Sequence, residues 1–187
     1  MKKPGNFAIN QHYGGERVKE EEVLQLLQHY RHDILNELQL LKGYVTLGKL
    51  EKVEEIMNNW VEHFDQERQL FRLHAPKWTI WLLRAKYRYH NIRVHVELQL
   101  KSSLNLSAID EQLVTQSEQV VTWLMEHGDR EALYVINIKV IEKNNVPNLI
   151  LRFHIHGLLQ PDQALEALEG AKRTEEGIEC EWSYLVN

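Results

Sequence analysis

The feature that most constrains this chain is one long stretch of helical periodicity, from about residue 18 to residue 47. A helix advances about 100° per residue, so its side chains can be placed around the axis from the sequence alone. The apolar side chains of this stretch gather on one wide face, which one partner helix is too narrow to cover. They are Val23, Leu24, Leu26, Leu27, Tyr30, Ile34, Leu35, Leu38, Leu40, Leu41, Tyr44 and Val45.

A second helix is predicted from residue 50 to about residue 73, after a break at Gly48-Lys49. Its apolar residues keep a heptad-like spacing, with acidic residues between them. Two long helices joined by a tight turn make an antiparallel hairpin. Because one hairpin cannot cover the wide apolar face of residues 18–47, we expect two hairpins to form a four-helix bundle, most simply in a symmetric homodimer.

The periodicity changes after Pro76, which suits the first turn of a third helix over residues 77–90. From there, apolar and polar residues alternate in several short segments, which is typical of half-buried strands. The fold class predicted is α+β, with a flexible tail at 1–15, a helical hairpin at 16–75 and an α+β module at 76–187. Within this module we expect strands at 92–100, 132–142, 148–156 and 178–186, and helices at 108–127 and 161–169, in the order β-α-β-β-α-β.

Composition excludes several classes of protein. The net charge of the 187 residues is -5, and no segment is rich in Lys and Arg alone, which argues against nucleic-acid binding. No apolar run is long enough to span a membrane, and the N-terminus lacks the apolar run of a signal peptide. Cys180 is the one cysteine, so no internal disulfide is possible, and its alternation with apolar neighbours predicts burial. We expect a cytoplasmic protein.

Opposite the apolar face of the first helix lies a narrow polar strip, whose centre is His32. Neutral imidazole is a nucleophile near pH 7 because its ordinary pKa is about 6.5. It can accept a phosphoryl group and pass it to a carboxylate. Arg31 could then neutralise charge, and Asp33 could orient a ring nitrogen or contact a partner. On position alone, however, most exposed histidines have no such role. The polar strip consists of Gln25, Gln28, His32, Asn36, Gln39 and Gly43.

The segment RHDILNELQLLKGYVTLGKLEKVEEI, residues 31–56, resembles the phosphoacceptor helix and turn of one histidine kinase subgroup. That pattern has Arg-His-Asp, then Asn, Leu-Gln and Gly, and a Leu-Gly-Lys-like turn. Sensor kinases carry it together with an ATP-binding domain. Sporulation initiation phosphotransferases of endospore-forming bacteria also carry it, and they resemble kinases whose ATP site has eroded. The matching residues are Arg31, His32, Asp33, Asn36, Leu38, Gln39, Gly43, Leu47, Gly48 and Lys49.

The C-terminal half favours the phosphotransferases. Its first long helix has no Asn-rich ATP-box pattern, and HIHG follows its third strand where a kinase has an Asp-x-Gly-x-Gly loop. Gly157, Gly170 and Gly177 stand alone instead of forming a glycine-rich lid. We therefore read residues 76–187 as a reduced kinase ATPase-like domain. No cofactor is expected in this chain, and Mg²⁺ is expected in a partner's acidic pocket.

The resemblance implies a relay between two response regulators. A single-domain regulator would give its phosphoryl group to His32, which would pass it to a second regulator, a transcription factor. Two alternatives stay open: a sensor kinase fragment that binds ATP weakly, and a dimer that docks a regulator without catalysis. The residues expected to support or dock the regulator are Arg31, Asp33, Gln28, Asn36, Gln39 and Gly43.

Other candidate sites have simpler explanations. His154 and His156 share one face of a strand, but no third ligand stands at a suitable spacing, so no metal site is predicted. The aromatic residues Trp78, Trp81, Tyr87 and Tyr89 are predicted to serve the core and helix packing. Glu118 and Glu126 lie on a helix where a solvated face is the simplest interpretation.

Overall fold

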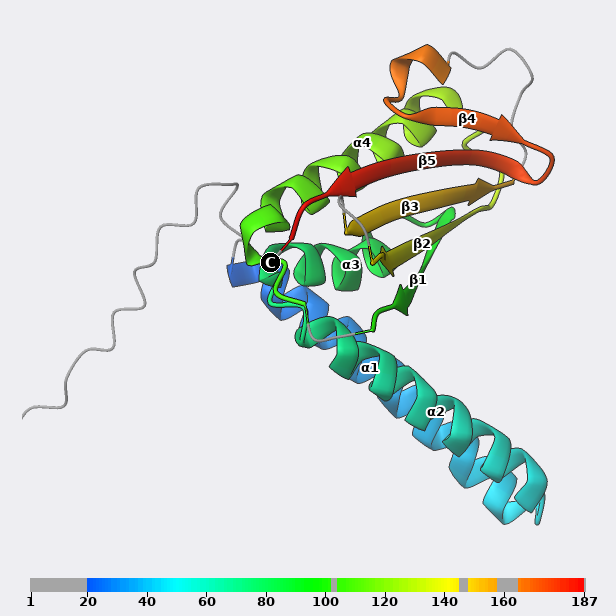
Figure 1. The fold of residues 1–187 in the computed structure, drawn as a ribbon. Coiled ribbons are helices and arrows are strands. Elements are labelled where there is room, and N and C mark those ends of the chain that lie inside the picture. Colours follow the sequence, from blue (N-terminus) through cyan, green and yellow to red (C-terminus); the bar gives the residue numbers. More distant parts are fainter. Residues whose placement is uncertain (1–19, 102–103, 145–147, 158–164, 187) are drawn as a thin grey trace, which may run out of the picture.

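The computed structural model describes residues 20–101, 104–144, 148–157 and 165–186. The flexible tail predicted for residues 1–15 lies outside the described residues. The fold is α+β, as predicted, with N-terminal helices followed by a C-terminal five-stranded sheet. Figure 1 shows the first two helices as a long hairpin that extends away from a module of sheet and helices.

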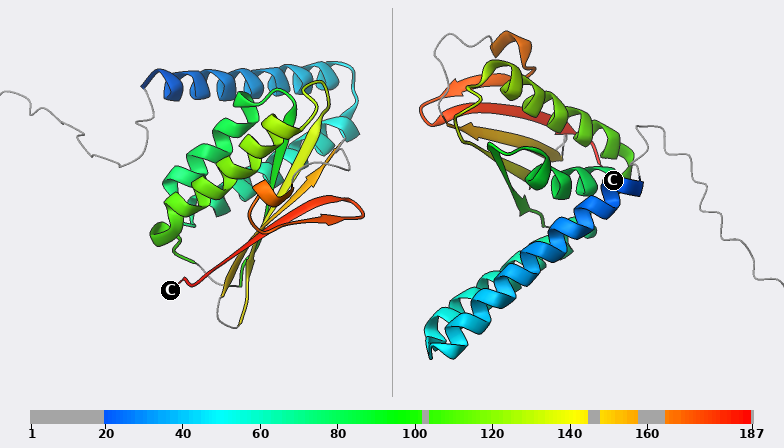
Figure 2. Two further views of the ribbon diagram at one scale, coloured as in Figure 1. Left: turned by 90° about the horizontal axis from the view of Figure 1, so that it is seen from above. Right: turned by 180° about the vertical axis from the view of Figure 1, so that it is seen from behind.

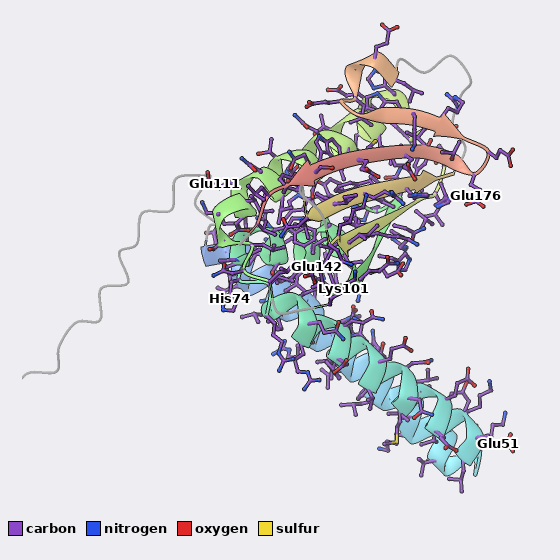
Figure 3. All side chains as sticks on the ribbon, in the orientation of Figure 1. Glu51, His74, Lys101, Glu111, Glu142 and Glu176 are labelled. Atoms are coloured by element: carbon purple, nitrogen blue, oxygen red, sulfur yellow. The ribbon has the colours of Figure 1, made fainter. Side chains whose placement is uncertain are left out.

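Helix α1 (Glu20–Thr46) and helix α2 (Leu50–Phe71) form this hairpin. Their described ends agree with the predicted bounds to within two residues. Gly48 in the turn has a φ of 66°, in the left-handed region that glycine adopts readily. The backbone N–H of Lys49 donates to the carbonyl of Tyr44 at 3.0 Å, which ends α1. Glu51 lies at the far tip of the hairpin (Figure 3).

A single hairpin leaves much of its apolar surface in water. On α1, Leu27 is 59% exposed and Leu38 is 46% exposed. On α2, four exposed apolar residues recur every seven positions, and Val61 is exposed as well, four positions after Met57. The apolar face predicted from the sequence is therefore only partly covered within one chain. The four residues with the seven-residue spacing are Leu50, Met57, Phe64 and Phe71.

The sheet has the strand order β1-β2-β3-β5-β4. The first pair, β1 and β2, is parallel, and the other neighbours are antiparallel. The parallel pair requires a crossover, which helix α4 (Asp110–His127) supplies. The strands are β1 (Ile92–Gln99), β2 (Tyr134–Glu142), β3 (Leu149–His156), β4 (Ala171–Thr174) and β5 (Gly177–Tyr184).

Helix α3 (Pro76–Arg88) packs beside α4, and both lie against the same face of the sheet (Figure 2). Alternate residues of β2, from Tyr134 to Val140, are buried, as the predicted alternation requires. Trp78 and Trp81 are buried in this core, which confirms that prediction. The indole N–H of Trp78 donates to the hydroxyl of Ser117 at 2.9 Å, so a large core side chain also has its polar atom satisfied.

The predicted order of elements was wrong near the C-terminus. The sequence predicts four strands, whereas the structure has a further strand, β4, which pairs with β5. This strand has only four residues, AKRT, with no run of alternating apolar side chains, because an edge strand with charged side chains needs none. The helix predicted at 161–169 lies partly outside the described residues. Its described end contains a 3₁₀ turn, Leu165–Ala167, not an α-helix.

Candidate functional site

The polar strip of α1 is open to water along its length. Every residue of the strip is exposed, as the helical geometry predicts. The His32 side chain is 71% exposed. Its Nδ1 lies 3.1 Å from the amide nitrogen of Asn36, one turn further along. The same amide nitrogen lies 3.4 Å from Nε2 of the ring, so the Asn36 amide lies beside the imidazole.

Asp33 is turned away from the polar strip, toward α3. Its Oδ2 accepts hydrogen bonds from the Lys86 ammonium at 2.7 Å and from the Tyr87 hydroxyl at 3.0 Å. Its Oδ1 lies 3.7 Å from Nδ1 of His32, a distance at which the two groups would form an ion pair if the ring were protonated. The hydrogen bond from Lys86 is the main cause that lowers the pKa of Asp33, and Tyr87 adds to it.

Further contacts tie α3 to the same flank of α1. The Tyr87 ring stacks on His29, with ring centroids 4.9 Å apart and planes at 14°. Two turns nearer the start of α1, Arg84 forms an ion pair with Glu22 at 2.9 Å. Lys86 is not among the site residues predicted from the sequence. Because Asp33 and Lys86 are 53 residues apart, no local pattern could have paired them.

On its other side, α1 is held by α2. The hydroxyl of Tyr30 donates to Oε2 of Glu67 at 2.9 Å. Burial, with the hydrogen bond to Glu67, raises the pKa of Tyr30 to about 12, so this donor keeps its proton at neutral pH. The helix that carries His32 is therefore held on two sides, while the strip stays open.

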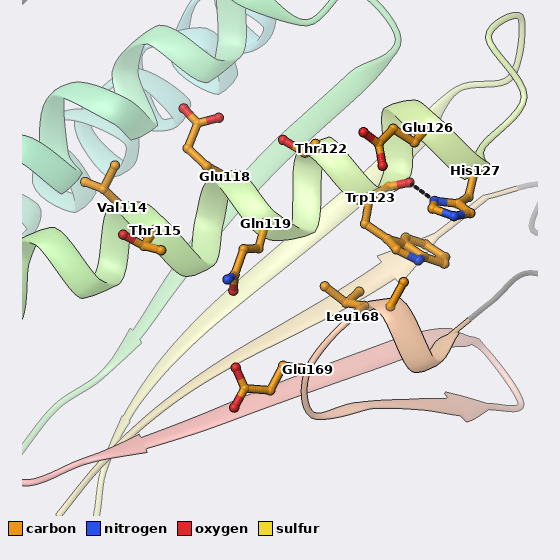
Figure 4. A pocket seen from close by; sticks show the side chains of 11 residues that line it. Val114, Thr115, Glu118, Gln119, Thr122, Trp123, Glu126, His127, Leu168 and Glu169 are labelled. Atoms are coloured by element: carbon orange, nitrogen blue, oxygen red, sulfur yellow. Dashed lines mark hydrogen bonds between the residues drawn. The ribbon is translucent and has the colours of Figure 1, made fainter. Parts of the chain in front are cut away.

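A pocket of about 520 Å³ lies along α4, beside residues 167–169 (Figure 4). Trp123 and Leu168 form its apolar part. The carboxylates of Glu118, Glu126 and Glu169 also line it, and no described lining residue is Lys or Arg. Its charge is therefore wrong for a polyphosphate.

The predicted solvated helix face is confirmed for Glu126, which is exposed, and is wrong for Glu118. Its carboxylate is half-buried and accepts a hydrogen bond from the indole N–H of Trp81 at 2.6 Å. The hydroxyl of Tyr89 donates to the other oxygen at 3.4 Å. The reason is that α3 packs directly beside α4, which the sequence periodicity of α4 alone does not reveal.

The strand histidines have structural partners. Nε2 of His154 lies 2.5 Å from a carboxylate oxygen of Glu179, and Nδ1 of His156 lies 3.0 Å from the carbonyl of Glu176. Within the described residues, no group of three or more His, Cys, Asp and Glu side chains could hold a metal ion. Cys180 is buried, as predicted, and burial raises the pKa of its thiol to about 12.

Comparison with known proteins bears on the same helices. Residues 16–73 match the family model described as the sensor kinase SpoOB-type alpha-helical domain. The hairpin is thus similar to that domain. The chain is also 27% identical to sporulation initiation phosphotransferase B of Bacillus subtilis (strain 168) over 145 residues, which cover 78% of this chain and 75% of the relative. In the part of the chain that the structure describes, no helix is both long and apolar enough to cross a membrane.

Proposed function

We propose that this chain is a histidine phosphotransferase of a sporulation phosphorelay, with His32 as the residue that carries the phosphoryl group. The observation that carries the proposal is the position of His32. It is an exposed histidine at the centre of an open polar strip, on a helix that matches the SpoOB-type domain. The name of the Bacillus subtilis relative supports the same reaction class.

The chemistry needs only a neutral imidazole and correct positioning. A ring nitrogen of His32 attacks the phosphorus of an aspartyl phosphate on the single-domain regulator. The N–P bond forms as the P–O bond breaks, and the aspartate carboxylate leaves. In the second step, a carboxylate of the transcription-factor regulator attacks phosphorus, and the imidazole leaves. Mg²⁺ in the regulator's pocket would neutralise charge on the phosphoryl oxygens, and Arg31 would add positive charge at the edge of the strip.

Regulators would dock along the polar strip. Gln28, Asn36 and Gln39 offer amide groups on the same line as His32. Gly43 completes this line, and a Cβ added there would meet nothing within 4 Å. Glycine inside a helix is less stable than alanine by about 1 kcal/mol, and packing within this chain does not require it. An absent side chain therefore fits the close approach of a partner's backbone better than a structural role.

The functional unit would be a homodimer. Its basis is the apolar surface that one hairpin leaves exposed on α1 and α2. A second hairpin would bury these side chains in a four-helix bundle and leave two polar strips facing outward. The protein would act in the cytoplasm, where its regulators are expected.

ATP has no role in this proposal, and the sheet module would be a reduced ATPase-like domain without a bound cofactor. The acidic lining of the pocket on α4 supports this interpretation. The first alternative, a sensor kinase fragment, requires ATP binding. The second, a docking dimer without catalysis, requires no phosphohistidine.

The test is to mix the protein with a phosphorylated response regulator, with and without ATP. The proposal predicts an acid-labile, alkali-stable label on the protein that does not depend on ATP. Labelling by ATP alone would support the kinase alternative. Regulator binding without any label would support the docking dimer.

A further inference from the structure

We infer that Lys86 and Tyr87 of α3 are positioning residues for His32, and that they act through Asp33. They hold one oxygen of the Asp33 carboxylate and balance its charge, so that this carboxylate, 3.7 Å from the imidazole, favours the protonated ring less and leaves a ring nitrogen able to attack phosphorus. The importance of this arrangement for phosphoryl transfer rests on the proposed function. The arrangement itself can be tested without any transfer.

The geometry shows where the carboxylate is held. Both donors from α3 converge on one oxygen, Oδ2, and the other oxygen stops 3.7 Å from Nδ1 of His32. The stacking of Tyr87 on His29 fixes the end of α3 that carries these donors. Asn36 then occupies the position beside Nδ1 that Asp33 leaves open.

Without the two donors, Asp33 could turn toward its neighbour. The Asp33 side chain has staggered rotamers that differ by about 120°, and the hydrogen bonds from Lys86 and Tyr87 stabilise the observed one. A carboxylate that reaches the ring would stabilise the imidazolium, because an opposite charge nearby favours the charged form. The imidazolium has no free lone pair and cannot attack phosphorus.

A second effect of an unpaired Asp33 carboxylate would also slow phosphoryl transfer. The incoming phosphoryl group is an anion, and an unpaired carboxylate beside the reacting nitrogen would repel it. The ammonium of Lys86 balances that charge. Three helices supply the charged and titratable groups around this position. They are His29, Tyr30, Arg31, Asp33 and Glu37 on α1, His63 and Glu67 on α2, and Lys86 and Tyr87 on α3.

The experiment compares the full-length protein with Lys86→Gln, Asp33→Asn and the double variant. Lys52→Gln is the matched control, because it removes a lysine from an exposed ion pair with Glu55 on the same hairpin. The first readout is an NMR titration of the His32 ring. The second is the pH dependence of label acceptance from a phosphorylated regulator.

Lys86→Gln should move the titration midpoint of the His32 ring upward by about half a pH unit, a modest shift because the site is exposed. The pH below which the protein stops accepting label should also move upward. The double variant should return the midpoint to that of the unchanged protein, since no free carboxylate remains. Lys52→Gln should leave the midpoint where it is.

Two outcomes would overturn the inference: a midpoint that Lys86→Gln does not move, or a shift that Asp33→Asn fails to reverse. A purely structural role for Lys86 would predict one of these. If the midpoint moves as expected but no variant accepts label, the positioning inference holds and the proposed phosphotransfer is wrong.

Discussion

The carboxylate of Asp110, at the start of α4, accepts a hydrogen bond from the backbone N–H of Trp78 at 2.8 Å, in the first turn of α3. Its second oxygen accepts from the backbone N–H of Lys77 at 3.0 Å. The first N–H groups of a helix have no partner within the helix, so one buried carboxylate from another helix satisfies two of them. This contact joins α3 to the sheet module, while the other end of α3 reaches Asp33.

Asp110→Ala should lower the free energy of unfolding by about 2 kcal/mol, because it removes the carboxylate that accepts from two backbone donors, one buried and one part-buried. Urea denaturation measures this change. Glu111→Gln is the control, since the Glu111 side chain is exposed and its ion pair with Lys77 should contribute little. If the Asp110→Ala protein were as stable as the control, the hydrogen bonds from the backbone of α3 to Asp110 would not contribute to stability.

Cys180 should resist thiol reagents in the folded protein at pH 8. Burial raises the pKa of its thiol to about 12, and the thiolate is the form that reacts. Labelling should be much faster in urea, where the pKa returns to about 8.5. The stability that this raised pKa contributes is complete below about pH 8.5 and is lost as the pH rises toward 12. Rapid labelling of the folded protein would contradict the burial of Cys180.

Phe64→Glu should convert a dimer to a monomer. It places a charge on the exposed apolar face of α2, which would be buried twice in a symmetric bundle. Sedimentation at micromolar concentration measures the change. Asn58→Glu, at an exposed polar position of the same helix, should remain dimeric. If the unchanged protein is itself a folded monomer, the proposed four-helix bundle is wrong.

Mg-ATP should give no measurable heat of binding in calorimetry at micromolar protein. The pocket on α4 presents carboxylates, and no described lining residue is a lysine or arginine that could hold the phosphates. A replacement of both Glu118 and Glu126 by Gln should not create binding, because a glycine-rich loop would still be lacking. Micromolar affinity in the unchanged protein would instead revive the kinase alternative.

The sequence predicted most of the elements because their signals are local. The heptad spacing of α2 and the strict alternation of β1 each arise because one face of a single segment is apolar. Such a pattern can be recognised from that segment alone. β4 escaped prediction because an edge strand held by backbone pairing leaves little pattern in its side chains. The contacts of Asp33 and the half-burial of Glu118 were not predicted for a different reason. Their partners lie on α3, and helix packing of that kind leaves no trace in local periodicity.

The central claim is that His32 carries the phosphoryl group, and its most direct test follows label from one regulator to the other through matched variants. His32→Gln keeps the size of the side chain and loses the nucleophile, so it should be folded and abolish transfer. Gly43→Leu should leave His32 able to accept a phosphoryl group but weaken regulator binding. The leucine side chain would fill the open space above position 43 that the regulator's backbone is proposed to approach. Gln39→Ala should weaken binding less. The account predicts an acid-labile, alkali-stable label in the unchanged protein and none in His32→Gln; continued transfer by His32→Gln would contradict it.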